Sequence, residues 1–419
     1  MVMAVSRCFR RIPVMNICIQ RRGSHLWYRR VQKTVIDFDV LHDDTMNVFA
    51  KVHGGTYDIG KGPLWRARMV TLPTGEESPR GVVAKHHSMI VFGVLHAITD
   101  ATTNLIIVKE LVTILNDILK GRPISSLPYP LAAPHAEKQV EVTKSYLAKY
   151  FCKRFYNVLV LDFNKKTTFG GLLPLPKDYV VDTRILKHVF DEEITKKLIS
   201  KCKENNTTVH SCVVTAANAA YMDIASEKTK NLVEQIGMYY TDSINLRRYY
   251  PKQEREHIGC HITMHEQKTI MSADSKSNFW STARNSKATL HEDLSSKSCL
   301  KIIPIIKWCA ILFPINIYRN KKGSRNLTDS HYITTNMGDV TKILDEPSDD
   351  DPVHVTDIFR SANGEQAGHL FTLTCNTFRK RIYLSVDYYS NKMTDSQASD
   401  FFNNMNLKLI SLAEKGELC

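Results

Sequence analysis

The stretch SMIVFGVLHAITDATTNLIIVKELVTILNDILKG covers residues 88–121 and changes its hydrophobic pattern near its middle. Its first part is an almost continuous apolar run, which is typical of a buried strand in a central position. From residue 103 to residue 120 the apolar residues recur at helical spacing, and Gly121 is placed to end the helix. A strand therefore leads into a helix, and His96 and Asp100 lie at the junction.

His96 and Asp100 form a His-x-x-x-Asp pair, the only one in the chain. A chain with 16 histidines and about two dozen aspartates is expected to contain roughly one such pair by chance. The spacing alone therefore assigns no function to either residue. A histidine in a turn at the end of a strand is more often structural than catalytic. The neighbouring sequence has to decide between the two roles.

The net charge of the 419-residue chain is +13, and most of it lies near the N-terminus. Residues 1–36 hold eight basic residues and no acidic one, which leaves +5 for the remainder. A protein that binds the phosphate backbone of a nucleic acid carries basic residues over much of its surface. The usual nucleic-acid-binding motifs are also missing from this sequence. We therefore expect no nucleic-acid partner.

The ten cysteines are far apart in the sequence, and none forms a C-x-x-C pair. This spacing disfavours a zinc site, and a chain of this length needs no disulfide framework. Cys260 and His261 lack a second pair that would complete a metal site. The chain also has no P-loop, dinucleotide fingerprint or G-x-S-x-G elbow. We expect free thiols, no metal and no prosthetic group.

Two segments bear on the location of the protein. Residues 1–36 are arginine-rich like a transit peptide, but they are poor in serine and lack the apolar core of a secretory signal. The apolar stretch 299–318 is interrupted by Lys301, Lys307 and two prolines, which disfavours a membrane-spanning helix. Such a stretch is buried, lines a channel or rests on a membrane surface. We expect a cytoplasmic protein, or a mitochondrial one if the transit peptide is genuine.

The remaining patterns predict two mixed lobes. Residues 34–41 and 46–52 alternate like half-buried strands, and a hairpin loop at 72–81 precedes the strand that leads to His96. After a proline-rich exit and a linker come two helices, several strands and a last helix at 396–414. This order fits the α/β (α+β) class.

Several sequence blocks accompany the His96 motif in a fixed order. They are GPLWRARMV (62–70), DSINLRRYYP (242–251) with HIGCHIT (257–263), YITTNMGDV (332–340) and RIYLSVDYYSNKMTD (381–395). With them the sequence, from about residue 21 to 413, resembles the chloramphenicol acetyltransferase-like superfamily. That superfamily includes nonribosomal-peptide condensation domains, alcohol acetyltransferases and plant BAHD acyltransferases, and its signature is H-x-x-x-D-G.

The resemblance implies two lobes, each a mixed sheet with packed helices, and an active site in the tunnel between the lobes. The expected boundaries are a basic N-terminal segment at 1–20 that looks like neither a strand nor a helix, an N-terminal lobe at 21–168, a crossover linker at 169–188 and a C-terminal lobe at 189–419.

The resemblance also implies the chemistry of the motif. His96 would act as a general base that removes the proton of an alcohol or amine as it attacks a thioester carbonyl. Asp100 would point away from the substrate and hold the loop through an arginine. Arg29 is the expected partner, because RRGSHLWYRRV (21–31) resembles an early Arg-His block of the family, and Arg66 or Arg68 is the alternative.

The second lobe would supply polar contacts to the substrate or to the oxyanion of the tetrahedral intermediate. Asn336 in the TTNMG segment is the expected donor, and Asn245 is implied as a further contact. Acyl-CoA is the expected co-substrate.

Three departures from the family pattern affect the interpretation. Ala101 stands where the family has glycine, which would strain the backbone if φ there is positive. Leu95 replaces the second histidine common in condensation domains, which favours the acyltransferases. The Asp-Phe-Gly-Trp-Gly motif of BAHD enzymes is missing.

We therefore expect a monomeric CoA-dependent acyltransferase that acts on a small or lipophilic hydroxyl or amine acceptor, with a possible peripheral membrane contact. One alternative is a catalytically impaired binding or scaffold protein with the same fold. Another is a condensation-type enzyme acting on carrier-bound substrates.

Overall fold

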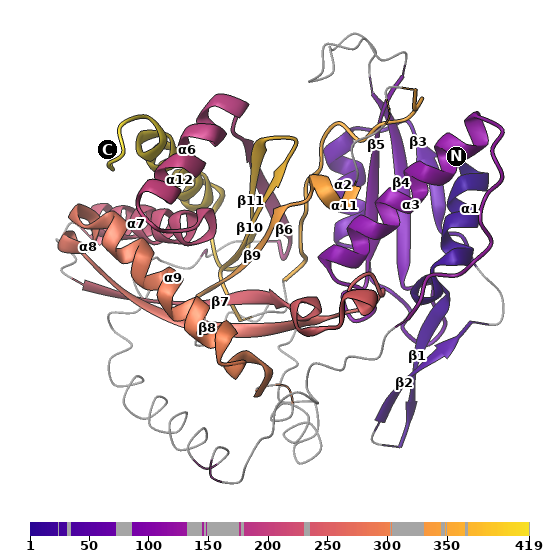
Figure 1. The fold of residues 1–419 in the computed structure, drawn as a ribbon, viewed down its shortest axis with the longest axis horizontal. Helices are drawn as coiled ribbons and strands as arrows, with labels where there is room; N and C mark the ends of the chain where they lie inside the picture. Colours follow the sequence, from indigo (N-terminus) through magenta and orange to yellow (C-terminus); the bar gives the residue numbers. More distant parts are fainter. Residues whose placement is uncertain are drawn as a thin grey trace. The chain divides into compact units, whose positions relative to one another are not determined.

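The computed structural model divides into two compact units, each with its own sheet (Figure 1). Unit 1 comprises Met1–His135, Leu246–Ile262 and Asp339–Ile358, and unit 2 comprises Ala136–Asn245, Thr263–Gly338 and Phe359–Cys419. The structure describes residues 1–23, 25–31, 35–72, 86–131, 145, 148, 176, 180–229, 235–301, 303, 331–344, 348, 350–364 and 368–418.

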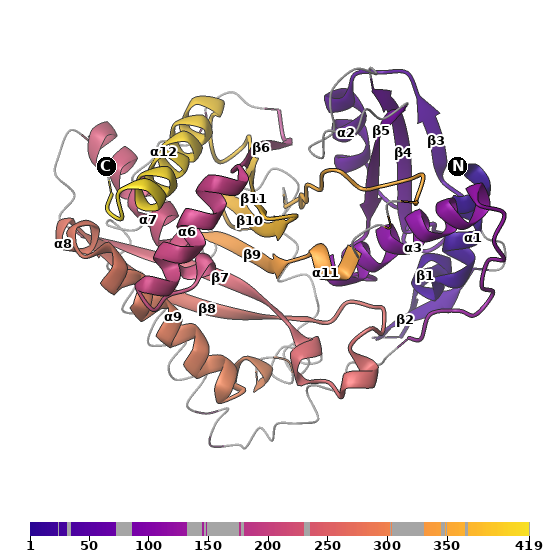
Figure 2. The ribbon, with the colours of Figure 1, turned by 45° about the horizontal axis from the view of Figure 1, so that its top comes forward.

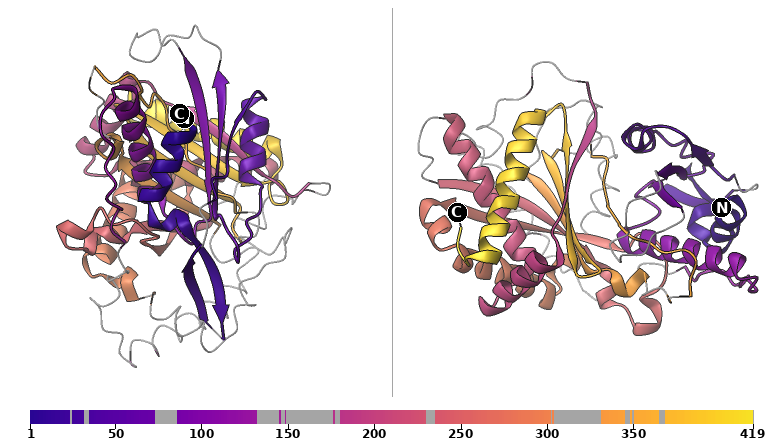
Figure 3. Two further views of the ribbon diagram at one scale, coloured as in Figure 1. Left: turned by 90° about the vertical axis from the view of Figure 1, so that its right-hand side faces the viewer. Right: turned by 90° about the horizontal axis from the view of Figure 1, so that it is seen from above.

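Among its described residues, unit 1 contains a three-stranded sheet, a separate two-stranded hairpin and several helices. Its elements are α1 (Val2–Arg11), η1 (Pro13–Asn16), β1 (Ile17–Arg22), β2 (His25–Arg30), β3 (Phe38–Leu41), α2 (Thr45–His53), β4 (Trp65–Leu72), β5 (His87–Val94), α3 (Ala101–Leu119), η4 (Leu246–Tyr249), η5 (Lys252–Glu254) and α11 (Thr341–Leu344). The sheet order is β3-β4-β5, with β3 parallel and β5 antiparallel to β4. Helices α1 and α3 cover one face and α2 the other (Figure 3, left).

In unit 2, the described strands form a six-stranded sheet with the order β6-β11-β10-β9-β7-β8. Its elements are β6 (Thr183–Val189), α6 (Glu192–Glu204), α7 (Val209–Thr229), β7 (Gln235–Asn245), β8 (Ile262–Ser272), α8 (Ala273–Ser277), α9 (Phe279–Ser295), β9 (Tyr332–Asp339), β10 (Phe371–Phe378), β11 (Arg381–Tyr389) and α12 (Asp395–Glu414). Helices α6, α7 and α12 lie on one side of this sheet (Figure 2) and share one apolar core with its strands.

The predicted helix after Asp100 is confirmed as α3, and the last helix is confirmed as α12. Thr394 and Gln397 form a reciprocal cap of α12, because the side-chain oxygen of each residue accepts a hydrogen bond from the backbone N–H of the other. Three segments in the first half of the chain differ from expectation: residues 45–53, strand β5 and residues 2–11.

Residues 45–53 form helix α2, although their alternation predicted a strand. Asp44 accepts hydrogen bonds from two backbone amides of the first turn and so caps the helix. Val48 and Val52, four residues apart, are buried on its inner side.

Strand β5 was expected at the centre of its sheet, but among the described strands it lies at an edge and β4 lies at the centre. Helix α2 packs on β5 and accounts for the apolar composition of this strand.

The basic N-terminal segment also differs from expectation, because residues 2–11 form helix α1. Its buried face belongs to the core of unit 1, where Phe9 stacks on Trp65 with ring centroids 3.7 Å apart. The N-terminus is therefore a structural part of unit 1.

The division of the chain is not the expected one of two continuous lobes. Leu246–Ile262 and Asp339–Ile358, from the second half, belong to unit 1. Strand β6 begins inside the predicted linker at 169–188 and ends at Val189. Most of the other linker residues lie outside the described residues. The loop at 73–81 and most of the apolar stretch 299–318 also lie outside them. Among the helices that the structure describes, none is long and apolar enough to cross a membrane.

Candidate active site around His96

Helix α3 begins directly after Asp100, and the aspartate is its N-cap. Oδ1 of Asp100 accepts a hydrogen bond of 2.8 Å from the backbone N–H of Thr103. Asp100 has an extended conformation (φ −122°, ψ 177°), as N-cap residues usually do. The local sequence thus explains why the strand-to-helix junction turns at this residue.

Ala101 is the first residue of α3 and does not have a positive φ. An alanine in the helical region is unstrained, and it favours the helix more than glycine would. The departure from the family's glycine is therefore harmless to the backbone here.

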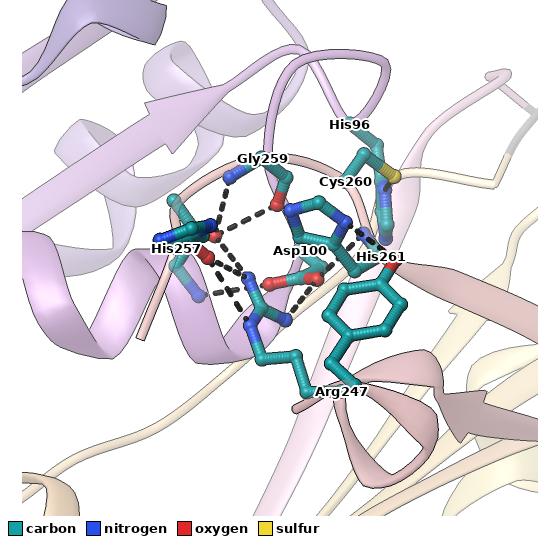
Figure 4. Close-up of polar contacts among 9 residues, drawn as sticks. His96, Asp100, Arg247, His257, Gly259, Cys260 and His261 are labelled. Atoms are coloured by element: carbon teal, nitrogen blue, oxygen red, sulfur yellow. Dashed lines mark hydrogen bonds and ion pairs between the residues drawn. The ribbon is translucent and has the colours of Figure 1, made fainter. Parts of the chain in front are cut away.

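The second carboxylate oxygen of Asp100 pairs with Arg247 (Figure 4). Nη1 of Arg247 donates to Oδ2 of Asp100 at 2.5 Å, and the backbone N–H of His261 donates to the same oxygen at 2.8 Å. Asp100 and Arg247 are 2% and 4% exposed, so the pair is buried. A buried ion pair is tolerated only when the remaining donors are satisfied. Here Nη2 of Arg247 donates to Thr103 Oγ1 and to the backbone oxygen of His257.

The expectation that Arg29, Arg66 or Arg68 pairs with Asp100 is wrong. Arg29 lies exposed on β2, and Arg68 forms its ion pair with Asp37 at 2.6 Å. Arg66 donates to the backbone oxygen of Thr56.

Arg247 could have been found in the sequence. It lies in the DSINLRRYYP block, which resembles a family strand written with Asn and Arg. The sequence separation of 147 residues hid the pairing, because only folding brings η4 beside the start of α3.

The segment His257–His261 closes over the start of α3 through a glycine turn. Thr103 Oγ1 donates to the backbone oxygen of Gly259 at 2.7 Å and accepts from its N–H at 3.1 Å. Gly259 has a φ of +146°, which side chains of L-residues rarely adopt. A Cβ at this position would lie 2.8 Å from Nε2 of His261. The turn therefore requires glycine, and it places Cys260 next to His96.

Replacing Gly259 with alanine is expected to lower the free energy of unfolding by about 2 kcal/mol, because of backbone strain and the close contact. Chemical denaturation followed by circular dichroism measures this loss. Gly60→Ala is the matched control, since Gly60 lacks a positive φ and its nearest neighbour, Asp58 Oδ1, would be 3.6 Å from a Cβ. Equal stability of the two variants would show that the turn does not need glycine.

His96 lies in the turn between β5 and α3, and its side chain is exposed. The turn is held from two sides. The hydroxyl of Tyr28 donates to the backbone oxygen of Ala97 at 2.6 Å. Nδ1 of His96 lies 3.8 Å from Sγ of Cys260, and Figure 4 shows the imidazole beside this sulfur while the carboxylate of Asp100 faces Arg247. Asp100 therefore does not contact the imidazole.

Cys260, which contacts His96, and the next residue, His261, have shifted pKa values. Burial, and to a smaller extent the charge of Asp100, raises the pKa of Cys260 to about 12. Burial, followed by the Arg247 cation, lowers the pKa of His261. Near neutral pH the first is therefore a protonated thiol and the second a neutral imidazole, whose Nδ1 lies 3.0 Å from the hydroxyl of Tyr250.

Asn336 and Asn245, the expected oxyanion or substrate contacts, both belong to unit 2. Oδ1 of Asn336 accepts a hydrogen bond of 2.7 Å from the N–H of Gly338, which leaves the Nδ2 amide as the donor of this side chain. Asn245 is exposed at the end of β7. Their roles, and a site in a tunnel between lobes, stay predictions. In the described part of the chain, no group of three or more His, Cys, Asp and Glu side chains is arranged to hold a metal ion.

No family model matches the sequence, and no curated protein matches it. Solved structures do match. The trichothecene 15-O-acetyltransferase from Fusarium sporotrichioides is 11% identical with a TM-score of 0.66, over 98% of this chain and 85% of that one. The chain has the chloramphenicol acetyltransferase-like fold. The first condensation domain of the calcium-dependent antibiotic synthetase is 12% identical with a TM-score of 0.62, over 98% of this chain and 87% of that one.

The chloramphenicol acetyltransferase-like fold supports more than one chemistry. The epimerization domain from the third module of tyrocidine synthetase B is also similar, with 12% identity and a TM-score of 0.58 over 99% of this chain and 90% of that one. At such low identity the likeness establishes the fold, and the predicted fold class is confirmed. The reaction has to be argued from the site.

Proposed function

We propose that this chain is an acyltransferase that moves an acyl group from a thioester to a hydroxyl or amine of a small or lipophilic acceptor. The observation that carries the proposal is the exposed imidazole of His96 on a turn held by a buried ion pair. A general base must reach its substrate and must keep its position, and His96 meets both requirements.

In the proposed reaction, Nε2 of neutral His96 takes the proton of the acceptor hydroxyl or amine as its oxygen or nitrogen attacks the thioester carbonyl. The tetrahedral intermediate collapses, the carbon–sulfur bond breaks, and the imidazolium returns the proton to the leaving thiolate. Donors from Asn336 or Asn245 would stabilise the oxyanion. Acyl-CoA is the proposed donor, and no covalent acyl-enzyme is needed.

A base that works through Nε2 carries its own proton on Nδ1. In that tautomer, the Nδ1–H of His96 donates to Sγ of Cys260, which lies 3.8 Å away. The raised pKa of Cys260 keeps a proton on the thiol, so no thiolate forms an ion pair with the imidazole. We assign Cys260 a positioning role toward His96.

Replacing Cys260 with alanine is expected to lower kcat about fivefold, as the loss of one weak hydrogen bond of about 1 kcal/mol predicts. Cys260→Ser retains an acceptor and is expected to recover most of the rate. The measurement is kcat against pH for both variants. A serine variant as impaired as the alanine variant would show that Cys260 contributes only packing.

Two other functions use the same fold. A condensation-type enzyme would take its thioester from a carrier protein, and the condensation domain among the structural neighbours supports this reading. A catalytically impaired scaffold would keep the fold without turnover. The unstrained conformation of Ala101 removes one sequence argument for the scaffold.

One assay separates these functions. The purified chain is incubated with acetyl-CoA, a long-chain acyl-CoA or the corresponding acyl-pantetheine, together with a panel of alcohols and amines, and the released thiol and acylated product are quantified. Turnover with acyl-CoA well above that with acyl-pantetheine supports the proposal. Comparable use of both donors would favour carrier-bound substrates, and no product from any donor would favour the scaffold.

A further inference from the structure

The hairpin formed by β1 and β2 exposes large apolar side chains beside arginines. In the left view of Figure 3 it extends beyond the three-stranded sheet of unit 1. Leu26, Trp27 and Tyr28 are consecutive on β2 and are 58%, 55% and 62% exposed. Four arginines are exposed on the same two strands: Arg21, Arg22, Arg29 and Arg30. Within the described residues, none of these arginines forms an ion pair with an acidic side chain.

Both faces of the hairpin combine apolar and basic side chains. Arg21 is paired with Leu26 across the strands, and residues directly opposite in an antiparallel pair share a face. Trp27 and Arg29, two residues apart on β2, share the other face. Two strands of six residues are about 20 Å long. The base of the hairpin is anchored, because Cys18 is buried and the N–H of Ile19 donates to Ile59.

We propose that this hairpin docks the protein on an anionic lipid surface. Tryptophan side chains such as Trp27 settle at the boundary between lipid and water, where the ring is apolar and the N–H stays hydrated. Arginines next to them are attracted to anionic headgroups. An anionic bilayer surface offers both properties at once, and the charge of the hairpin is complementary to it.

Other occupants fit the hairpin less well. Two copies of the chain would bring eight arginines together, and the repulsion between them opposes a dimer through this surface. A nucleic acid would use the arginines and stack on Trp27, but it has no hydrocarbon interior in which Leu26 would be buried. The small positive charge outside residues 1–36 also provides no continuing path for a phosphate backbone.

The hairpin contacts the candidate site through Tyr28, whose hydroxyl donates to the backbone of the His96 turn. On the proposed function, docking would therefore bring a lipid-dissolved acceptor to the turn that carries the base. The docking itself does not depend on catalysis, so the two proposals can fail separately.

The test is co-sedimentation of the full chain with vesicles of phosphatidylcholine alone or of phosphatidylcholine mixed with phosphatidylserine. Binding is expected for the mixed vesicles and not for the neutral ones, and high salt is expected to weaken it. The double variant Arg21→Gln/Arg22→Gln should lower the partition coefficient about 25-fold, because each arginine contributes roughly a factor of five. Trp27→Ala should lower it about tenfold. Circular dichroism checks that each variant is folded.

The matched control is Arg122→Gln/Arg284→Gln, which removes the same charge from exposed positions outside the hairpin. This variant should bind mixed vesicles like the unmodified chain. Three results would overturn the proposal: no binding to mixed vesicles, an equal loss in the control and hairpin variants, or binding of single-stranded RNA in place of vesicles. Self-association that depends on Trp27, seen by analytical ultracentrifugation, would instead assign the hairpin to a second copy of the chain.

Discussion

Replacing His96 with alanine is expected to lower kcat for acyl transfer about a thousandfold, with KM for the thioester nearly unchanged. General-base catalysis contributes roughly 10²- to 10⁴-fold, and the acceptor proton has no other base in the proposed reaction. Because His96 is exposed and lies outside the apolar cores, its removal should leave the stability of unit 1 unchanged. Release of free thiol from acyl-CoA, measured with the best acceptor of the panel, gives both constants.

The control for this experiment is His86→Ala, an exposed histidine just before β5 that has no place in the proposed reaction. It should retain full activity. Activity of the His96 variant within a fewfold of the unmodified chain would remove His96 as the base, even if the chain is confirmed as an acyltransferase. The thermal midpoint of both variants shows whether any loss of activity comes from unfolding.

Replacing Arg247 with alanine is expected to lower the free energy of unfolding by about 3–5 kcal/mol, because it leaves the buried carboxylate of Asp100 without its cation. The same change also removes the hydrogen bond to Thr103 Oγ1 and those that Nε and Nη2 donate to the backbone oxygen of His257. The segment that carries Cys260 would then lose part of its attachment to α3, and kcat should fall together with stability. Denaturant unfolding and the thiol-release assay measure the two effects.

Arg248→Ala is the matched control, because Arg248 is the next residue and is exposed. Its effect on stability should stay below about 0.5 kcal/mol. The double variant Asp100→Asn/Arg247→Met should be more stable than Arg247→Ala, since no uncompensated charge remains. A loss of less than 1 kcal/mol in Arg247→Ala would show that the pair behaves like an exposed ion pair and does not hold the turn.

Much of the local structure could be predicted from the pattern of apolar residues. The spacing from residue 103 to 120 predicted α3, and the acidic start of the segment after Phe190 agrees with the N-terminus of α6. The pattern failed at residues 45–53, where four alternating positions fit a strand as well as a helix. There the cap at Asp44 and burial of one face decided for the helix.

The candidate site could be predicted only in part. His96 and Asp100 were singled out by their place between a strand and a helix, together with the resemblance of the surrounding blocks. The partner of Asp100 was misassigned, because several arginines were equally available in the sequence. Cys260 was considered only as a metal ligand, and its contact with His96 depends on the positive φ of Gly259.

The sequence by itself determined the strand-to-helix junction, because apolar periodicity and an N-capping carboxylate are properties of neighbouring residues. The N-cap found in the structure is equally local, because Oδ1 of Asp100 accepts from the N–H of Thr103, three residues further along the chain. Only the tertiary structure decided which cation neutralises that aspartate and which side chain borders His96. Arg247 is more than 140 residues from Asp100 along the chain, and Cys260 is more than 140 residues from His96. The free energy of burying the carboxylate depends on whether the fold places a cation beside it. A pattern of neighbouring residues contains no information about which distant cation that is.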